Sequence, residues 1–290
     1  MKILISGATG TLGHGLSKYL ESSNKFEIIR HGLKNQSDFQ LDFTNKNTLI
    51  NFLDYLKPNF IVNLVCLSNV DECEKNLKKA YLYNSEVVKF ISFWAKYNNC
   101  KIIHISTDQV YDKINYFNKE DDVNIKNNYA LSKLEGEKHL SVENSCILRT
   151  NFFGNSNSKK TLNEWLLDSI KNNKQINLFS DIKFNPVSMN TLYRLIDHII
   201  CNFKGGLYNF GAKNGISKAD FCFQIMKKFD IHYDKINILS VEHSDLFAYR
   251  PKGMVMNTQK FANTFNFKIP KIEDEIFSLP KENIYQNENK

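Results

Sequence analysis

The stretch KILISGATGTLGHGL at residues 2–16 joins an apolar strand, a glycine-rich turn and the start of an amphipathic helix. In its turn, Gly7, Gly10 and Gly13 stand at G-x-x-G-x-x-G spacing. Such glycines permit a tight turn, let backbone amides approach a pyrophosphate and let the helix pack on the strand. A glycine turn without a ligand is the alternative, but the position at the first strand–helix junction favours a dinucleotide-binding loop. The loop residues predicted to contact this cofactor are Gly7, Thr9, Gly10, Thr11, Leu12 and Gly13.

The alternation that begins in this stretch continues through the first half of the chain. Short apolar runs alternate with longer helical patterns over residues 3–6, 12–21, 26–29, 45–56, 60–63, 74–97 and 101–105. The early strands are apolar throughout, as are strands buried on both faces of a parallel sheet. We therefore predict an α/β fold with a doubly wound parallel sheet of Rossmann-like type.

The regular alternation breaks after a helix at 129–140 and a strand at 146–148, where residues 151–160 are rich in Asn and Ser. Beyond the break, helices at 162–171, 191–201 and 217–229 and a strand at 206–210 follow at less even spacing. We predict a cofactor-binding domain over residues 1–150, with 176–201 returning to it. Residues 151–175 and 202–290 are predicted to form a smaller C-terminal α/β substrate-binding region.

Composition excludes several classes of protein. The 290 residues are 42% hydrophobic and 13% aromatic, which is too apolar for a mainly disordered chain. No apolar run reaches 18 residues, so no membrane span is expected. The apolar run that starts at Ile3 leaves no room for a signal peptide before it, so we expect a cytoplasmic protein.

Charge and cysteine usage narrow the range of partners. The 38 basic and 31 acidic side chains give a net charge of +7, which suits an anionic small molecule or a nucleic acid. Because the lysines are scattered among acidic residues, a mixed-charge surface without a nucleic-acid partner is favoured. The six cysteines contain no C-x-x-C pair and no histidine at ligand spacing, so we expect reduced thiols and no metal site.

The end of the second strand indicates which dinucleotide binds. An acidic side chain at this point bonds a ribose 2′-hydroxyl, whereas arginine accommodates a 2′-phosphate. Here Arg30 and His31 end the strand, and no carboxylate follows before Asp38. We predict a preference for NADPH over NADH, with Arg30 contacting the phosphate and Lys34 as a second candidate. The alternative is that Arg30 is only a surface charge.

A tyrosine and a lysine are spaced to act together. Tyr129 and Lys133 are four residues apart in a helical pattern and share one face. An ammonium group stabilises a nearby phenolate, so the pair can transfer a proton closer to neutral pH. Ser106 and Thr107 close a strand at its carboxyl end, where open α/β sheets bind ligands. Although Y-x-x-x-K also occurs by chance, its combination with the glycine loop favours catalysis.

These residues carry a resemblance to the extended short-chain dehydrogenase/reductase superfamily, and within it to the dTDP-4-dehydrorhamnose reductase type. The matching segments continue through Val62-Asn63, Val70-Asp71, His104-Ile105-Ser106-Thr107-Asp108, YALSKLEGE at 129–137, Leu148-Arg149-Thr150, Arg250-Pro251 and Asn257-Thr258-Gln259-Lys260. The resemblance implies that Tyr129 donates a proton, Lys133 holds the nicotinamide ribose and tunes Tyr129, and Thr107 bonds the substrate oxygen. The implied reaction is NADPH-dependent reduction of a nucleotide-activated 4-keto-6-deoxy sugar for surface polysaccharide synthesis.

The resemblance also implies roles for residues outside the triad. Asp42 and Asn63 match positions that line the adenine and ribose sites, Asn84 matches one that supports the fold near the cofactor, and Phe43, Leu64 and Val65 complete the predicted cofactor contacts. The predicted substrate contacts are Ser106, Asp108, Asn151, Trp165, Asn185 and Arg250. Arg250 can pair with a diphosphate through its planar donors, and the alternative is a surface arginine. Trp165 can stack on a base or sugar, and the alternative is a place in the core.

Several departures leave the sugar and its nucleotide open. Residues 64–69, Gln109, residues 181–187 and Asn257 differ from the usual family residues where a sugar would bind. Two alternatives remain: an NAD(P)-dependent epimerase or dehydratase of nucleotide sugars, and a non-catalytic NADP-binding regulatory subunit. Gln109 after Asp108 argues against a dehydratase, which carries Glu there. The helices predicted at 74–97 and 129–140 could form a homodimer, as in many relatives.

Overall fold

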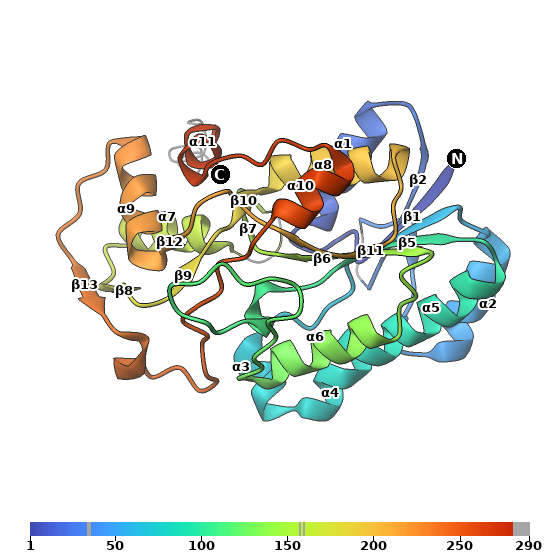
Figure 1. Cartoon of the computed structure of the whole chain (residues 1–290), viewed down its shortest axis with the longest axis horizontal. Coiled ribbons are helices and arrows are strands. Elements are labelled where there is room, and N and C mark those ends of the chain that lie inside the picture. The colour runs from blue at the N-terminus through green and yellow to red at the C-terminus, as the bar shows by residue number, and fades with distance from the viewer. Residues whose placement is uncertain (34–35, 157, 159, 281–290) are drawn as a thin grey trace.

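The computed structural model describes residues 1–33, 36–156, 158 and 160–280, and a seven-stranded sheet runs through its centre (Figure 1). All neighbouring strands of this sheet are parallel. From one edge to the other they are β11 (Gly206–Phe210), β6 (Ser145–Thr150), β5 (Lys101–Ile105), β4 (Phe60–Asn63), β1 (Lys2–Ser6), β2 (Glu27–Gly32) and β3 (Phe39–Gln40). The predicted doubly wound α/β fold is confirmed. The prediction missed β3, because two residues are too short to form an apolar run.

Helices cover both faces of the sheet (Figure 1). On one face lie α1 (Gly13–Ser22), α8 (Met189–Cys201) and α10 (Gln259–Phe265), and on the other lie α2 (Lys46–Leu56), α5 (Val87–Tyr97) and α6 (Asn128–Lys138). Because side chains alternate along a strand, Ile3 and Ile5 of β1 pack in the core with α1, whereas Leu4 packs in the core with α2. None of the helices in the described ranges is long and apolar enough to cross a membrane.

The helix predicted over 74–97 is interrupted. It forms α3 (Val70–Lys75), α4 (Leu77–Tyr81), a π-helical turn (Leu82–Glu86) and α5. Asn76 ends α3 and caps α4, since its side chain accepts a hydrogen bond from the backbone N–H of Lys79. The π turn contains Asn84, one of the residues predicted to lie near the cofactor. Single π turns inside helices often occur at functional sites.

The C-terminal elements lie beside the carboxyl ends of the central strands. The helices are α7 (Leu162–Lys171), α9 (Lys218–Phe229) and α11 (Ile272–Phe277), and the strand pairs are β7 (Phe152–Phe153) with β10 (Val187–Ser188), β9 (Lys183–Phe184) with β12 (Ile216–Ser217), and β8 (Ile176–Phe179) with β13 (Ile236–Leu239). Three segments connect this region with the central sheet or with one another. β11 is an edge strand of the central sheet, β8 pairs with β13, and α8 packs on α1.

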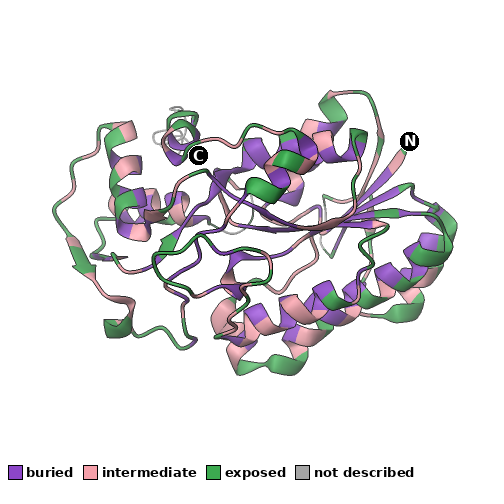
Figure 2. Ribbon diagram, viewed as in Figure 1, coloured by how far each residue is buried: buried purple, intermediate pink, exposed green. Residues whose placement is uncertain are grey.

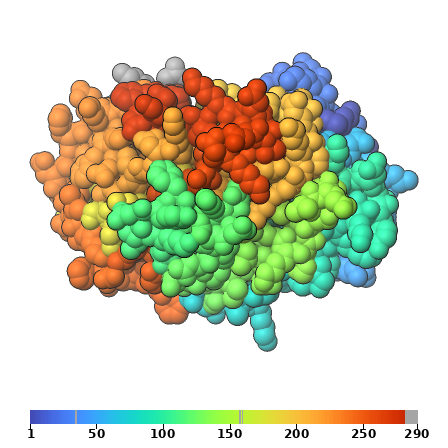
Figure 3. All heavy atoms as spheres, in the orientation of Figure 1, coloured from blue at the N-terminus to red at the C-terminus, as the bar shows by residue number. Residues whose placement is uncertain are grey.

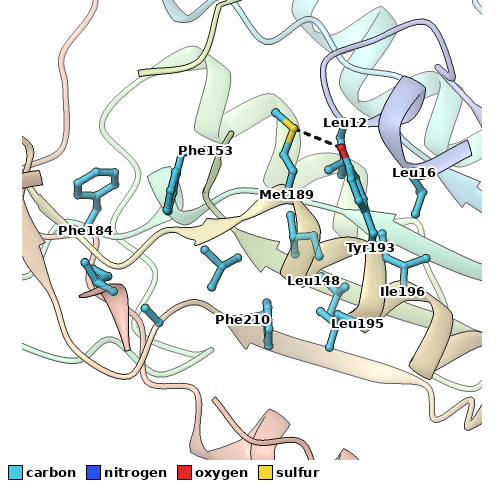
Figure 4. Close-up of a cluster of buried hydrophobic side chains, with 14 of the residues drawn as sticks. Leu12, Leu16, Leu148, Phe153, Phe184, Met189, Tyr193, Leu195, Ile196 and Phe210 are labelled. Carbon is cyan, nitrogen blue, oxygen red and sulfur yellow. Dashed lines mark hydrogen bonds between the residues drawn. The ribbon is translucent and has the colours of Figure 1, made fainter. Parts of the chain in front are cut away.

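One apolar core extends from the central sheet into the C-terminal region. Figure 4 shows Leu16 of α1 and Tyr193 of α8 on one side of this core and Phe153 and Phe184 on the other. The Tyr193 hydroxyl is close enough to donate to the sulfur of Met189, at 3.4 Å. Burial of each large apolar side chain stabilises the fold by about 1.5–3 kcal/mol. Figure 2 shows that the central strands and the inner faces of the helices are buried. The central sheet and the C-terminal elements therefore share one core.

The loop after β5 is attached to the C-terminal segment. In Figure 3 this green loop lies against the orange and red end of the chain. The backbone N–H of Asn118 donates to Val255 O at 2.8 Å, and the fully buried Asn118 amide donates to Gly253 O and Val255 O. A Cβ on Gly253 would stand 2.3 Å from the carbonyl of Lys113, so glycine permits this close approach. The attachment positions the region around Arg250 beside the start of α6.

Candidate functional site

Two adjoining cavities lie at the carboxyl ends of the central strands. The chain runs from β1 towards β2 on one side and continues at β4 on the other, which makes the β1–β4 boundary the switch point of the sheet. The β2 cavity, about 660 Å³, is lined by His31, Asp42 and Phe43 among others. The β5 cavity, about 490 Å³, is lined by Thr107 and Tyr129 among others. Both cavities share the lining residues Gly7, Gly10, Leu64, Cys66 and Ser158.

The glycine loop forms the wall between the cavities. Gly7 has a φ of +80°, and a Cβ there would lie 3.0 Å from the Leu64 carbonyl carbon. A Cβ on Gly13 would lie 2.5 Å from Gly7 O, so glycine lets α1 begin against the loop. No side chain caps α1 at Leu12, which leaves its N-terminus for an anion. Thr9 lines the β2 cavity, and Thr11, Leu12 and Gly13 line the β5 cavity. The loop therefore fits a dinucleotide pyrophosphate.

The β2 cavity is lined by residues that the resemblance assigns to the cofactor. Asp42, Phe43 and Val65 line it, as predicted from the resemblance. The Asp42 carboxylate is held in a turn by the Thr44 backbone N–H and hydroxyl, at 2.9 and 2.7 Å. The His31 ring stacks on Phe43 with centroids 3.4 Å apart. Burial lowers the pKa of His31 to about 4, so its ring is neutral and its Nε2–H donates to Leu41 O at 2.8 Å.

Arg30 lines neither cavity, so the structure does not bring it to the predicted phosphate contact. Its side chain pairs with Asp38, with Nη2 2.6 Å from Oδ1, and lies 3.6 Å from Glu21 of α1. The Asp38 bond raises the pKa of Arg30, and the Arg30 bond holds the pKa of Asp38 below its usual value. Because alternate residues of a strand face opposite ways, Arg30 faces α1 while His31 faces the cavity. Lys34, the second candidate, lies outside the described residues.

The three predicted catalytic side chains meet in the β5 cavity. Thr107, Tyr129 and Lys133 all line it, from the end of β5 and the first two turns of α6. Thr107 caps a short 3-10 turn, Asp108–Val110, by accepting a hydrogen bond from the Gln109 N–H at 3.1 Å. Asn127 caps α6 by accepting from the Ala130 N–H at 2.8 Å. The caps place the threonine and tyrosine hydroxyls in the same cavity.

The surroundings of the Tyr129 phenol favour its protonated form. Burial raises the pKa of its phenol well above 10, the adjacent Cys66 thiol adds to the rise, and hydrogen bonding to Thr107 opposes it. The Lys133 side chain is buried, and its Nζ donates to Ile105 O at 2.7 Å. The site therefore places a phenol and a second hydroxyl in one cavity, which the buried Lys133 side chain also lines.

A chain of buried polar groups lies behind Lys133. Lys133 Nζ is 3.3 Å from His104 Nε2, and His104 Nδ1 is 3.0 Å from Asn63 Nδ2. Asn63 accepts from the Ser6 hydroxyl at 2.8 Å, so the chain reaches the end of β1. Burial and the charge of Lys133 hold the pKa of His104 well below 6.5. Asn63, predicted to contact the cofactor, thus supports the site through these bonds and lines neither cavity.

Asn84 also supports the site without lining either cavity. Its side chain accepts from the Leu67 N–H at 2.8 Å and donates to Leu67 O and to the Ser132 hydroxyl. The contacts tie the loop at residues 64–69 to α6. At Gly136 of α6, a Cβ would stand 2.2 Å from Asn84 O, so only glycine permits this approach.

Three of the predicted substrate residues line the β5 cavity: Ser106, Asp108 and Asn151. The Ser106 hydroxyl donates to Glu137, a member of a buried ion pair, so it is already bonded within the fold. Asp108 accepts a hydrogen bond from Asn151 Nδ2 at 2.7 Å. Burial raises the pKa of Asp108 to about 6, although the bonds from Asn151 and Thr107 oppose the rise.

The other three predicted substrate residues line neither cavity. Trp165 is 38% exposed on α7, so it belongs neither to the core nor to the site. Asn185 is fully buried and bonds Ala212 O, Met256 O and the Met256 N–H, which makes it a structural link. Arg250 pairs with Asp71 at 2.8 Å and donates to Ala248 O. The structure therefore does not bring these three side chains into either cavity, and the charge of Arg250 is balanced by Asp71.

Sequence reasoning missed two side chains at the site. Cys66 lines both cavities and touches Tyr129, at a position where the sequence departs from the family pattern. Lys218 begins α9, and its charge interacts with those of Asp108 and Arg250. The Cys66 departure was a usable signal, whereas nothing in the sequence around Lys218 indicates that its charge would interact with that of Asp108.

Comparison with known proteins agrees with this geometry. The family described as RmlD substrate binding domain matches residues 1–283. A dTDP-4-dehydrorhamnose reductase of Aggregatibacter actinomycetemcomitans is 29% identical, covering 92% of this chain and 94% of its own. The spore coat polysaccharide biosynthesis protein SpsK of Bacillus subtilis is 24% identical, covering 84% and 85%. A solved dTDP-4-dehydrorhamnose reductase of Clostridium acetobutylicum superposes with a TM-score of 0.87 at 26% identity, covering 96% and 97%.

Proposed function

Because the chain belongs to the RmlD substrate-binding-domain family, we propose that it is an NADPH-dependent reductase of a nucleotide-activated 4-keto-6-deoxy sugar. The observation that carries the proposal is the meeting of Thr107, Tyr129 and Lys133 in a cavity that adjoins a dinucleotide-shaped one across the glycine loop. The dTDP-4-dehydrorhamnose reductases among its relatives support the substrate class.

The chain's own residues can bind, orient and protonate such a substrate. Bound NADPH would supply the hydride that adds to the keto carbon. The Thr107 hydroxyl can hold the keto oxygen beside Tyr129, which transfers its proton to that oxygen as the carbonyl becomes an alcohol. The buried Lys133 ammonium stabilises the phenolate left on Tyr129. Positioning and electrostatics are the protein's whole contribution.

The proposed preference for NADPH no longer rests on Arg30. Among the residues that line the β2 cavity after β2, Gly32, Leu33 and Gln36 bring no carboxylate to repel a 2′-phosphate. The Asp42 carboxylate, which also lines this cavity, is held in a turn by Thr44. Asp38, the nearest carboxylate after β2, is neutralised by Arg30. A solved relative of Bacillus anthracis was crystallised with NADP, which supports a nicotinamide cofactor of this kind.

A role in making a surface polysaccharide belongs to the same proposal. The B. subtilis relative is named for spore coat polysaccharide biosynthesis, and a Haloferax volcanii relative is named as a probable reductase of low-salt glycan biosynthesis. Both names support a glycan pathway. A cytoplasmic location remains a prediction from the sequence.

A homodimer is part of this proposal and is supported by one face of α5. Phe93 and Tyr97 are exposed on this helix, 58% and 70%, and pack edge to face with centroids 5.3 Å apart. Light scattering of the purified chain should give twice the mass of one chain. A Phe93→Glu variant should then be monomeric, whereas a wild-type mass of one chain would refute the dimer.

The decisive experiment follows NADPH absorbance with a panel of enzymatically generated nucleotide-linked 4-keto-6-deoxy sugars. Tyr129→Phe removes the proton donor, so turnover should be abolished while NADPH affinity changes little. Tyr55→Phe, on the exposed face of α2, is the matched control and should retain wild-type activity. Full turnover in Tyr129→Phe would remove Tyr129 from the mechanism. Tight NADPH binding without turnover of any sugar would favour an epimerase or a regulatory subunit.

A further inference from the structure

Three polar side chains stand side by side near the carboxyl ends of three neighbouring strands. Ser6 of β1 pairs in register with Asn63 of β4, and Asn63 pairs with His104 of β5. All three are buried, and they are called the polar row below. The next strand, β6, brings Ile147 opposite His104, so the row ends at the histidine. His104 is also the member of the row that Lys133 of α6 reaches.

Hydrogen bonds hold the polar row together. The Ser6 hydroxyl donates to Asn63 Oδ1 at 2.8 Å, and Asn63 Nδ2 lies 3.0 Å from His104 Nδ1. The other ring nitrogen, His104 Nε2, lies 3.3 Å from Lys133 Nζ. Within the part of the chain that the structure describes, no buried nitrogen or oxygen of these four side chains lacks a partner. A buried polar network that is satisfied in this way is rigid, so the ring of His104 has a fixed place.

The polar row replaces apolar packing that the same strands show one step earlier. Leu4, Ile61 and Ile102 precede its members by two residues and share one face of the sheet with them, in the core beneath α2 and α5. Burial of polar groups is unfavourable unless they are hydrogen-bonded, so apolar residues would fill this place at lower cost. The row lines neither cavity, and what it contacts outside the sheet is Lys133. Its effect on the site must therefore pass through Lys133.

The amino group of Lys133 depends on His104 for its position. It ends a flexible four-carbon chain and is buried. Among the residues that the structure describes, its hydrogen-bond partners are Ile105 O at 2.7 Å and His104 Nε2. His104 is thus the one described side chain that holds it. Burial and the charge of Lys133 keep the pKa of His104 well below 6.5, so the neutral ring does not repel an ammonium.

We propose that His104 is a positioning residue of the reductase, whose ring fixes the Lys133 amino group beside Tyr129 and the nicotinamide ribose. This inference rests on the proposed function. Without the ring, Lys133 keeps one anchor, Ile105 O, and its amino group can turn away from the site. Proton transfer requires groups held in place, so the chemical step suffers most. Binding of the sugar should change little, because the proposed sugar contacts do not include Lys133.

The test compares two amides at position 104. In His104→Gln the amide reaches as far as Nε2 did, so it can still bond Lys133. In His104→Asn the shorter amide reaches only as far as Nδ1, so it can bond Asn63 while Lys133 loses its partner. His104→Asn should lower kcat by about tenfold to a hundredfold at nearly constant KM for the sugar, whereas His104→Gln should stay within about threefold of the wild type. The thermal unfolding midpoint verifies that both variants are folded.

NADPH affinity gives a second measurement that needs no turnover. Fluorescence titration should show binding weakened by about threefold to tenfold in His104→Asn and nearly unchanged in His104→Gln, since one hydrogen bond to Lys133 separates them. In a Lys133→Met background the same substitution at 104 should have no further effect on affinity, because the group that His104 positions is gone. Ser6→Ala, the mildest change to the polar row, should lower kcat by about twofold in the same direction, and it decides the matter if His104→Asn does not fold.

Three outcomes would overturn the proposal. One is an equal effect of Gln and Asn at position 104 on kcat and on NADPH affinity. Another is a loss of affinity from His104→Asn that persists unchanged in the Lys133→Met background, which would indicate a purely structural role. The third, where His104→Asn does not fold, is a wild-type kcat in Ser6→Ala. Failure of the proposed function is distinguishable, because a wild type that turns over no sugar still yields the NADPH affinities that decide this inference.

Discussion

Glu137 and Arg149 form a buried ion pair beneath the candidate active site, with Arg149 Nη2 2.6 Å from Glu137 Oε2. The pair joins α6 to β6, and Glu137 also accepts a hydrogen bond from Ser106 at the end of β5. Arg149 donates further to the Tyr111 hydroxyl and to Glu120 O. The three elements that carry or flank the triad are thereby fixed to one another.

Glu137→Gln should destabilise the protein by about 3 kcal/mol, because it leaves the Arg149 charge buried without a counterion. Urea unfolding at neutral pH measures the free energy. Glu135→Gln, which breaks the exposed pair of Glu135 with Lys138 on the same helix, is the control and should cost about 0–1 kcal/mol. An equal loss in both variants would show that the buried pair does not hold the site together.

Gly136→Ala should weaken NADPH binding as well as stability. The added Cβ would meet Asn84 O at 2.2 Å, which pushes α6 away from the π turn and disturbs the loop that lines both cavities. We expect a loss of more than about 1 kcal/mol in unfolding free energy. Fluorescence titration with NADPH gives the affinity. Lys138→Ala, an exposed position of the same helix, should leave both quantities near wild type.

Stability should fall as the pH drops from about 6.5 to 4. Burial lowers the pKa of His31 to about 4 in the folded state from 6.5, so the unfolded chain binds this proton first and acid favours unfolding. The shift corresponds to about 3 kcal/mol, fully present above pH 6.5 and lost as the pH falls to 4. Urea unfolding across this range should show a shallower slope for His31→Gln than for the wild type. His232→Gln, at an exposed position, controls for the loss of a histidine.

Leu33→Asp should shift the cofactor preference towards NADH. Leu33 lies at the rim of the β2 cavity and is 55% exposed, so a carboxylate there can bond a ribose 2′-hydroxyl and repel a 2′-phosphate. The measurement is kcat/KM with each cofactor, and the expected change in their ratio is about tenfold or more. Leu33→Asn introduces a side chain of the same shape as aspartate but without its charge, so this variant should retain the wild-type preference. A wild type that already prefers NADH would refute the proposed NADPH preference.

Local patterns were enough to predict much of the fold. The runs that became β4, β5 and β11 were placed at their observed ends, because apolar side chains predominate in each of these short stretches. The helix over 74–97 was less well predicted, since the cap at Asn76 and the π turn at Asn84 depend on hydrogen bonds that periodicity does not reveal.

The sequence by itself determined the glycine loop and the convergence of Tyr129 with Lys133, because both depend on spacing within one turn or one helix. Only the tertiary structure decided the partners of the polar side chains. Arg30 pairs with Asp38 instead of facing the cavity, Asn185 is a buried link, and Lys218 comes to lie beside Asp108. A charged or amide side chain acts according to what surrounds it, and those surroundings come from segments that are distant in the sequence and meet only on folding.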